Sequence, residues 1–198
     1  MTFTTTAYTQ TFKRYSSENA ENFAKRIYKE VGDLKYPIIE TNKWDSSKLV
    51  IICFIGDNYT VLGYLLIPIN DTIYKQVFID SYSGNAATLG VEIKNVFFSN
   101  ADKDKQNEII VTTKHRSKSP RFADNLVEGF YYENHIYDNP NFYNPLDTLK
   151  QMTELSKKFS RGFEGRIYNK KTEKLVRKEK AEFKNEKNIR LKLKQMGY

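Results

Sequence analysis

Residues 48–68, which read KLVIICFIGDNYTVLGYLLIP, have the pattern of a buried β-hairpin. Lys48 to Ile55 is a continuous apolar run, as expected of a strand that is covered on both faces. Gly56-Asp57-Asn58 supplies turn chemistry, Tyr59 to Ile67 returns as the partner strand, and Pro68 ends that strand. The interior of the protein is therefore predicted to contain an antiparallel pair of strands.

Three further strands are predicted in the middle of the chain, at about Thr72 to Ile79, Val91 to Phe98 and Glu108 to Thr113. Most connections between the strands are too short to hold a crossover helix, which favours antiparallel pairing. The sequence thus predicts a mostly antiparallel sheet of about five strands.

Helices are predicted before and after this region of strands. After Ser17, which is suited to an N-cap, apolar residues recur at the i, i+3, i+4, i+7 spacing of a helix until Gly32 stops it. Asn144 and Pro145 are suited to the N-cap and first turn of another helix, which extends to about Phe159. These helices are expected to flank the sheet.

The C-terminal half is expected to add more helix. A short helix is predicted from Ala123 to Tyr132, followed by an ordered loop over Glu133 to Pro145. Lys170 to Met196 is rich in helix-forming Lys, Glu, Leu and Arg, although its apolar residues are sparse and poorly periodic. The prediction is an α+β core domain over residues 1–165 and a basic, largely helical C-terminal extension over residues 166–198.

The positive charge of the protein belongs to that extension. The whole chain carries a formal net charge of +8. Arg166 to Tyr198 holds twelve Lys/Arg against four Glu, whereas residues 1–165 hold twenty cations and twenty anions. Such asymmetry points to a nucleic acid or an acidic protein surface as a partner.

Two basic segments are candidates for contact with nucleic acid, since lysine and arginine bind phosphates by releasing counterions. The candidate residues are Arg116, Lys118, Arg121, Lys170, Lys171, Lys174, Arg177, Lys178, Lys184, Lys187 and Arg190. The alternative is that the four glutamates of the extension pair with lysines one turn away on an ordinary solvated helix. No recognition helix or RNA-binding aromatic motif accompanies the charge, so base-specific contacts are not predicted.

A group of aromatic residues lies next to the first basic segment. Its members are Phe130 and the five candidate contact residues Tyr131, Tyr132, Tyr137, Phe142 and Tyr143. Aromatic side chains supply many interface hot spots, which makes this group a candidate protein-binding surface. The same residues would equally serve to fill a core beneath a long loop.

The sequence contains no recognisable motif of a catalytic or metal centre. The protein is therefore predicted to be non-enzymatic and without a cofactor. Asp80 with Glu92 and Lys94 superficially resembles the carboxylates and lysine of metal-dependent nucleases, but such a pattern arises readily in a highly charged chain. The segment between Gly84 and Gly90 vaguely resembles the pyrophosphate-binding turn of coenzyme A-dependent acetyltransferases. The basic residue and the tight glycine spacing of that turn are missing.

The cysteine and histidine residues also favour structural roles. Cys53 is the one cysteine and lies in an apolar run, so it is expected to be a small core residue in a reducing compartment. His115, beside basic residues, is predicted to join a surface patch, and His135 to be a hydrogen-bonded structural residue. No secretory signal or membrane span is recognised, so a cytoplasmic protein without membrane contact is expected.

From Met1-Thr2-Phe3-Thr4, through Phe163-Glu164-Gly165, to the Lys-rich finish at residues 192–198, the chain resembles the sigma-factor-binding protein of large lytic staphylococcal phages. The resemblance is one of length, composition and general sequence character over the whole chain. It implies a viral protein in the host bacterial cytoplasm that binds the promoter-recognising C-terminal domain of the primary sigma factor within RNA polymerase. Such a protein would inhibit or redirect host transcription, with its basic extension near promoter DNA. The competing hypothesis is a DNA-binding accessory protein that acts through the extension alone.

Overall fold

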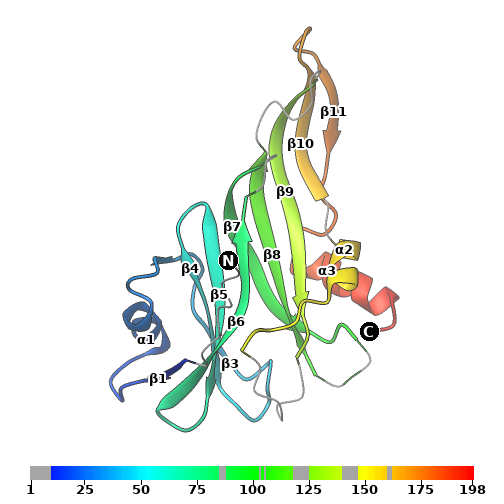
Figure 1. The fold of residues 1–198 in the computed structure, drawn as a ribbon. Coiled ribbons are helices and arrows are strands. Elements are labelled where there is room, and N and C mark those ends of the chain that lie inside the picture. The colour runs from blue at the N-terminus through cyan, green and yellow to red at the C-terminus, as the bar shows by residue number, and fades with distance from the viewer. Residues whose placement is uncertain are drawn as a thin grey trace, which may run out of the picture.

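The computed structural model describes residues 10–84, 88–102, 104, 106–117, 125–139, 147–159 and 162–198. Strands hold 51% of these residues and three short helices hold 15%, so the protein is mostly β. The eleven described strands form two antiparallel sheets that pack face to face (Figure 1). The predicted α+β fold, with one sheet of about five strands and a largely helical extension, is therefore wrong.

The first sheet contains the predicted hairpin. Its strands are β1 (Thr11–Lys13), β6 (Ile73–Ser83), β5 (Thr60–Pro68), β4 (Val50–Gly56) and β2 (Asp33–Leu34) in spatial order, with β3 (Ile39–Thr41) also paired to β4. The predicted hairpin is confirmed by β4 and β5, and the predicted cover on both faces of its first strand is confirmed for Val50 to Ile55. Ile52 and Phe54 face the second sheet, whereas Ile51 and Cys53 pack toward a helix on the opposite face. The expected core position of Cys53 is also confirmed.

The second sheet is built from the later strands. They are β11 (Leu175–Glu179), β10 (Gly162–Asn169), β9 (Asn125–Tyr137), β8 (Glu108–Ser117) and β7 (Thr88–Ser99) in spatial order. The helix predicted from Ala123 to Tyr132 is wrong, since residues 125–132 belong to β9, and the predicted loop is a strand as far as Tyr137. Alternate residues of this segment face opposite sides of the sheet, and pairing with both β8 and β10 satisfies its backbone.

Three helices cover the outer faces of the two sheets. Helix α1 (Ala20–Ile27) packs on the first sheet, and its N-cap is Asn19 rather than the predicted Ser17. Helices α2 (Thr153–Phe159) and α3 (Glu186–Gln195) cover the second sheet, where they bury Phe159 and Leu193 against it (Figure 1). The molecule therefore has four layers, with α1 on one side and α2 and α3 on the other.

The core between the sheets draws on the strands from β4 to β9. Its buried residues are Trp44, Val50, Ile52, Phe54, Val61, Leu65, Val77, Ile79, Tyr82, Ile93, Phe98, Ile109, Val111, Tyr137 and Leu149. Leu149 comes from the segment before α2, which pairs with β6 through Thr148 rather than continuing a helix back to Pro145. The predicted helix ending at Phe159 is thus confirmed only from Thr153 onward, and its first residues lie outside the described part of the chain.

The C-terminal region is a strand pair followed by one helix. Residues 165 and 166, between which the sequence placed the start of the extension, are consecutive positions within β10. Asn169 ends β10, and its side-chain Oδ1 accepts hydrogen bonds from the N–H groups of Lys171 (2.9 Å) and Thr172 (3.0 Å). This Asx turn reverses the chain into β11. Only Glu186–Gln195 is helical in the described residues of this region.

Candidate nucleic-acid interface

The hairpin of β10 and β11 forms one edge of the second sheet and projects beyond the first sheet (Figure 1). We define its residues 166–180 as the basic arm. Every residue from Lys170 to Lys178 is exposed. The arm therefore offers a long accessible edge rather than a face buried in the sandwich.

The charge of the arm is strongly positive. Its cations are Arg166, Lys170, Lys171, Lys174, Arg177, Lys178 and Lys180, and its anions are Glu173 and Glu179. Arg177 pairs with Glu179 at 2.6 Å. Among the residues that the structure describes, no ion pair involves Lys170, Lys171, Lys174 or Lys178. Four ammonium groups of the arm therefore have no ion-pair partner among the described residues.

Close backbone packing anchors the arm to the sheet. Gly129 of β9 lies directly opposite Gly165 of β10. A Cβ atom on Gly165 would lie 2.1 Å from the carbonyl oxygen of Glu128 and 2.6 Å from the ring of Phe163. The ring of Phe163 covers this glycine pair, an arrangement known to stabilise glycine in sheets. Phe163 also packs on Tyr131, with ring centroids 5.0 Å apart.

The outer face of the second sheet continues the arm toward β7. Leu89, Arg116, Phe130 and Glu164 occupy one row across four strands. The ammonium group of Lys114 lies 4.2 Å from the ring centroid of Phe130. We call Leu89, Arg116 and Phe130 the outer row; all three side chains are exposed.

Strand pairing brings one predicted cation of the middle segment close to the arm. Arg116 pairs with Phe130, and two residues along β9 Glu128 pairs with Arg166, which in turn pairs with Lys178. Directly paired residues share a face of the sheet, so Arg116 and Lys178 lie on the same side. The sequence predicted residues of both segments as candidates for nucleic-acid contact, and the sheet places Arg116 and Lys178 on one face.

Other predicted cations belong to the packing of the C-terminal helix. Lys184 binds both carboxylate oxygens of Glu164 at 2.6 and 2.7 Å. Arg190 binds Glu186 at 2.7 Å and donates to the carbonyl oxygen of Phe98 at 2.7 Å. Lys187 is exposed on α3, away from the strands of the arm. Lys118 and Arg121 lie outside the described residues.

The predicted aromatic group does not form one surface. Tyr137 is fully buried between the sheets, and its hydroxyl donates to Asp80 Oδ2 at 2.7 Å. Tyr132 is 8% exposed, and Tyr131 packs on the arm's anchoring ring. Phe142 and Tyr143 lie outside the described residues. Phe130, the first residue of the predicted group, is 38% exposed. Sequence reasoning missed Leu89, which joins Phe130 only through the pairing of β7 with β8 and of β8 with β9.

One histidine is buried and the other is half-buried. The predicted structural role of His135 is confirmed, since it is paired with Gln151 at 3.0 Å and its burial lowers its pKa. The predicted surface position of His115 is wrong, because that side chain is 3% exposed and binds Thr113 at 3.0 Å. Strand alternation in β8 turns His115 inward and Arg116 outward.

The residues of the two enzyme alternatives have structural partners. Asp80 accepts the hydrogen bond of Tyr137, whereas Glu92 pairs with Lys114 at 3.0 Å on the outer face of the second sheet. The glycine-rich segment ends at Gly90 within β7, so no helix begins there to present N–H groups to a pyrophosphate.

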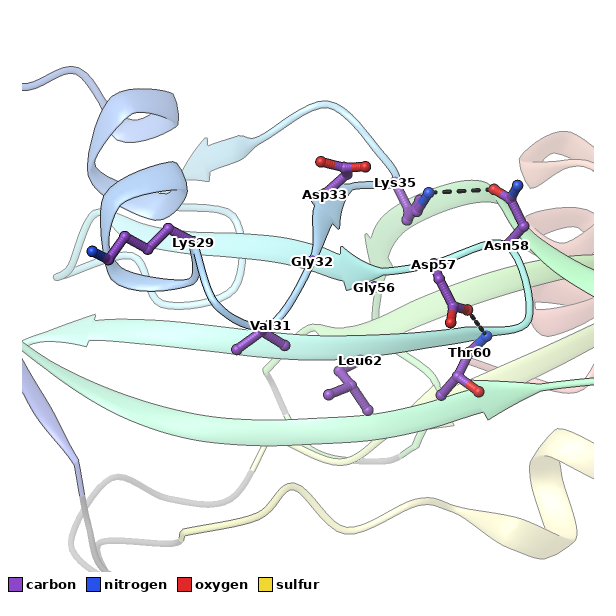
Figure 2. Close-up of a pocket in the computed structure, with 10 residues that line it drawn as sticks. All are labelled: Lys29, Val31, Gly32, Asp33, Lys35, Gly56, Asp57, Asn58, Thr60 and Leu62. Atoms are coloured by element: carbon purple, nitrogen blue, oxygen red, sulfur yellow. Dashed lines mark hydrogen bonds between the residues drawn. The ribbon is translucent and has the colours of Figure 1, made fainter.

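A pocket of about 480 Å³ opens at the end of the first sheet (Figure 2). Its lining residues are Lys29, Val31, Gly32, Asp33, Lys35, Gly56, Asp57, Asn58, Thr60 and Leu62. Figure 2 shows that the polar groups hold the β4–β5 turn together: Asp57 accepts from the N–H of Thr60 at 2.7 Å, and Lys35 donates to Asn58 at 3.3 Å. Among the described residues that line the pocket, there is no histidine, cysteine or serine.

Comparison with protein-family models, curated proteins and solved structures found no match for this chain. Within the described residues, none of the helices combines the length and apolar character needed to cross a membrane.

Proposed function

We propose that this protein is a non-enzymatic binding protein that contacts DNA through the basic arm while its body binds the primary sigma factor of bacterial RNA polymerase. The observation that carries the DNA contact is the exposed edge with four lysines that have no described carboxylate partner. The sigma factor as the protein partner rests on the resemblance of the whole chain to phage sigma-binding proteins. Both contacts together would alter how the polymerase uses promoters.

The arm suits the phosphate backbone better than base edges. Lys174 directly precedes β11, and Arg177 and Lys178 lie on that strand, which rises roughly 3.3 Å per residue. Duplex DNA carries a negative charge for about every 1.7 Å of its axis, so successive lysines meet several phosphates. Lysine acts as a point charge that does not distinguish one base from another. We therefore expect the affinity of the arm for DNA to be independent of the DNA sequence and sensitive to salt.

The outer row is our candidate for the protein contact. Phe130 is 38% exposed and Leu89 is 48% exposed, and both flank Arg116 beside the arm. Aromatic and arginine side chains of this kind anchor many protein interfaces. A sigma domain seated on the outer row would lie next to DNA held by the arm.

The DNA contact is tested by fluorescence anisotropy with a labelled duplex over 50 to 200 mM salt. The arm variant carries Lys170→Gln, Lys171→Gln, Lys174→Gln and Lys178→Gln. We expect it to bind at least tenfold more weakly at low salt and to lower the slope of log affinity against log salt by about 3 to 4. A helix variant with the same change in charge, at Lys158, Lys187, Lys192 and Lys194 of α2 and α3, is the control. Equal losses in both variants would overturn the assignment to the arm.

The sigma contact is tested separately, by titrating the isolated C-terminal domain of a primary sigma factor with the full chain. We expect binding that the arm variant retains and that Phe130→Ala weakens at least tenfold. Tyr59→Ala, at a side chain that is 70% exposed on the first sheet, is the matched control. Absence of sigma binding would overturn this part of the proposal, and salt-sensitive binding to DNA alone would favour the accessory DNA-binding protein.

A further inference from the structure

Three acidic side chains meet at the end of the second sheet opposite the arm. Asp102 follows β7, Glu108 begins β8 and Asp138 follows β9, so the ends of three strands bring them together. One carboxylate oxygen of each residue lies within 4.8 Å of the other two. The register places this end near the Ile109–Tyr137 pair, whereas the arm pairs with the start of β9.

One oxygen of the central carboxylate lacks a described partner. Glu108 is fully buried, and its Oε2 accepts a hydrogen bond from the N–H of Ala101. Its Oε1 is also buried, and within the described residues no hydrogen-bond donor reaches it. A buried carboxylate oxygen without a donor is strongly unfavourable unless a proton or a cation meets it. This orphaned oxygen is an observation separate from the clustering of the acids.

The surroundings of Glu108 add negative charge. Asp104 lies in the same loop, and burial together with the charges of Asp102 and Asp104 raises the pKa of Glu108 to about 7. The described positive charge near the cluster is Lys150, which acts on Asp138. Lys103 and Lys105 of the loop lie outside the described residues, so the test below includes them.

We propose that Asp102, Glu108 and Asp138 bind a hard divalent cation, with Ca²⁺ as the best fit, and that this ion ties the β7–β8 loop to the end of β9. Carboxylate oxygens are the ligands that hard cations prefer. Ca²⁺ lies about 2.3–2.6 Å from its ligands, so oxygens on opposite sides of the ion are about 4.6–5.2 Å apart. The separation of the three ligand atoms, at most 4.8 Å, is thus in the range spanned by oxygens around one Ca²⁺ ion.

The fold of the loop is consistent with such a site. The N–H of Asp104 donates to Asp102 Oδ1 at 2.8 Å, and the N–H of Gln106 donates to Asp104 Oδ1 at 2.7 Å. These bonds hold the backbone of Asp104 and Gln106 against the side chains of Asp102 and Asp104. The alternate spacing of Asp102, Asp104 and Gln106 matches positions 1, 3 and 5 of known calcium-binding loops, where oxygen ligands alternate with other residues.

The direct test is isothermal titration calorimetry of CaCl₂ into the full chain at pH 7.5, after removal of metal with a chelator. We expect one site per chain and a thermal midpoint that rises with the concentration of calcium. Glu108→Gln and Asp102→Asn are expected to weaken binding at least tenfold. Both replacements keep the shape of the side chain, and circular dichroism of each variant confirms that it remains folded.

Two controls separate this site from its alternatives. Asp71→Asn, at an exposed aspartate in the β5–β6 turn, should leave calcium binding unchanged. Heat and stabilisation that persist unchanged in Glu108→Gln would overturn the proposal, because the ion would then be binding elsewhere. Absence of binding by Ca²⁺, Mg²⁺ and Mn²⁺ at millimolar concentration would also overturn it. In that case a loss of stability in the Lys103→Gln, Lys105→Gln variant would identify a lysine as the partner of the cluster.

Discussion

Tyr137 joins the two sheets through a hydrogen bond to Asp80. Its hydroxyl, buried between the sheets, donates to the carboxylate of Asp80 on β6 at 2.7 Å. A hydrogen bond to a charged group contributes about 1.5–3 kcal/mol. We expect Tyr137→Phe to lower the free energy of unfolding by about that amount, measured by urea denaturation. Tyr59→Phe, at an exposed side chain, should change it by less than about 0.5 kcal/mol. Similar losses in the two variants would contradict this role.

Whether a single side chain is buried or exposed could be predicted from the sequence only where its strand was assigned correctly. Cys53 was predicted to be buried because its strand was recognised, and it is. His115 was assigned to the surface from its basic neighbours, yet β8 continues through it to Ser117. Alternation along that strand buries His115 and exposes Arg116. Charge in the neighbourhood therefore predicts a residue's burial poorly until the strand that carries it is known.

Elements were predictable where apolar runs and turn residues agreed. The strands from β4 to β8 were found in this way, with ends that differ by a few residues. The strands β9, β10 and β11 were missed because their charged and aromatic residues have weak strand patterns, and those in β10 and β11 include good helix formers. Pairing with a neighbouring strand over eight positions overrides such local preference.

Helix α3 is held by a narrow apolar stripe, which explains why the sequence showed poor periodicity. Ile189 and Leu193, four residues apart, are buried against the second sheet, whereas Leu191 is 55% exposed. We expect Leu193→Ala to lower the free energy of unfolding by about 2–4 kcal/mol, because it leaves a cavity under the helix. Leu191→Ala is the matched control and should cost less than about 0.5 kcal/mol. Urea denaturation measures both, and equal costs would show that α3 does not dock as described.

At the scale of the whole molecule, the candidate interface depends on strand order. Arg116 and Lys178 are distant in sequence, and the order β8-β9-β10-β11 places them on one face. The sequence located the positive charge correctly, but it placed the charge on a helix. A hairpin at the edge of the sheet differs from a helix, because it exposes lysines on its turn and on its outer strand. The sequence alone could not predict that these two residues share a face, because this depends on the register of four paired strands.

The two sheets also enclose a group whose protonation couples folding to pH. His135 lies against Tyr82 of the first sheet, with ring centroids 5.1 Å apart. Burial lowers the pKa of His135 below its ordinary value of 6.5, although the charges of Glu133 and Asp80 act in the opposite direction. The unfolded chain therefore takes up a proton near pH 6.5, and the folded protein does so only at lower pH. Between these two values the free energy of unfolding falls as the pH falls, by up to about 1.4 kcal/mol per pH unit.

This prediction is measured as a difference between two proteins. Glu108 has a raised pKa and acts with the opposite sign, since its contribution to stability is lost as the pH rises toward 7. Urea denaturation of the wild type and of His135→Gln, from pH 5.0 to 7.5 and in the presence of a chelator, cancels that contribution. We expect the stability of the wild type relative to the variant to decrease steadily below pH 6.5 and to be constant above pH 7. A difference that is independent of pH would mean that His135 takes up its proton equally well in the folded protein, and that the space between the sheets is open to water at this point.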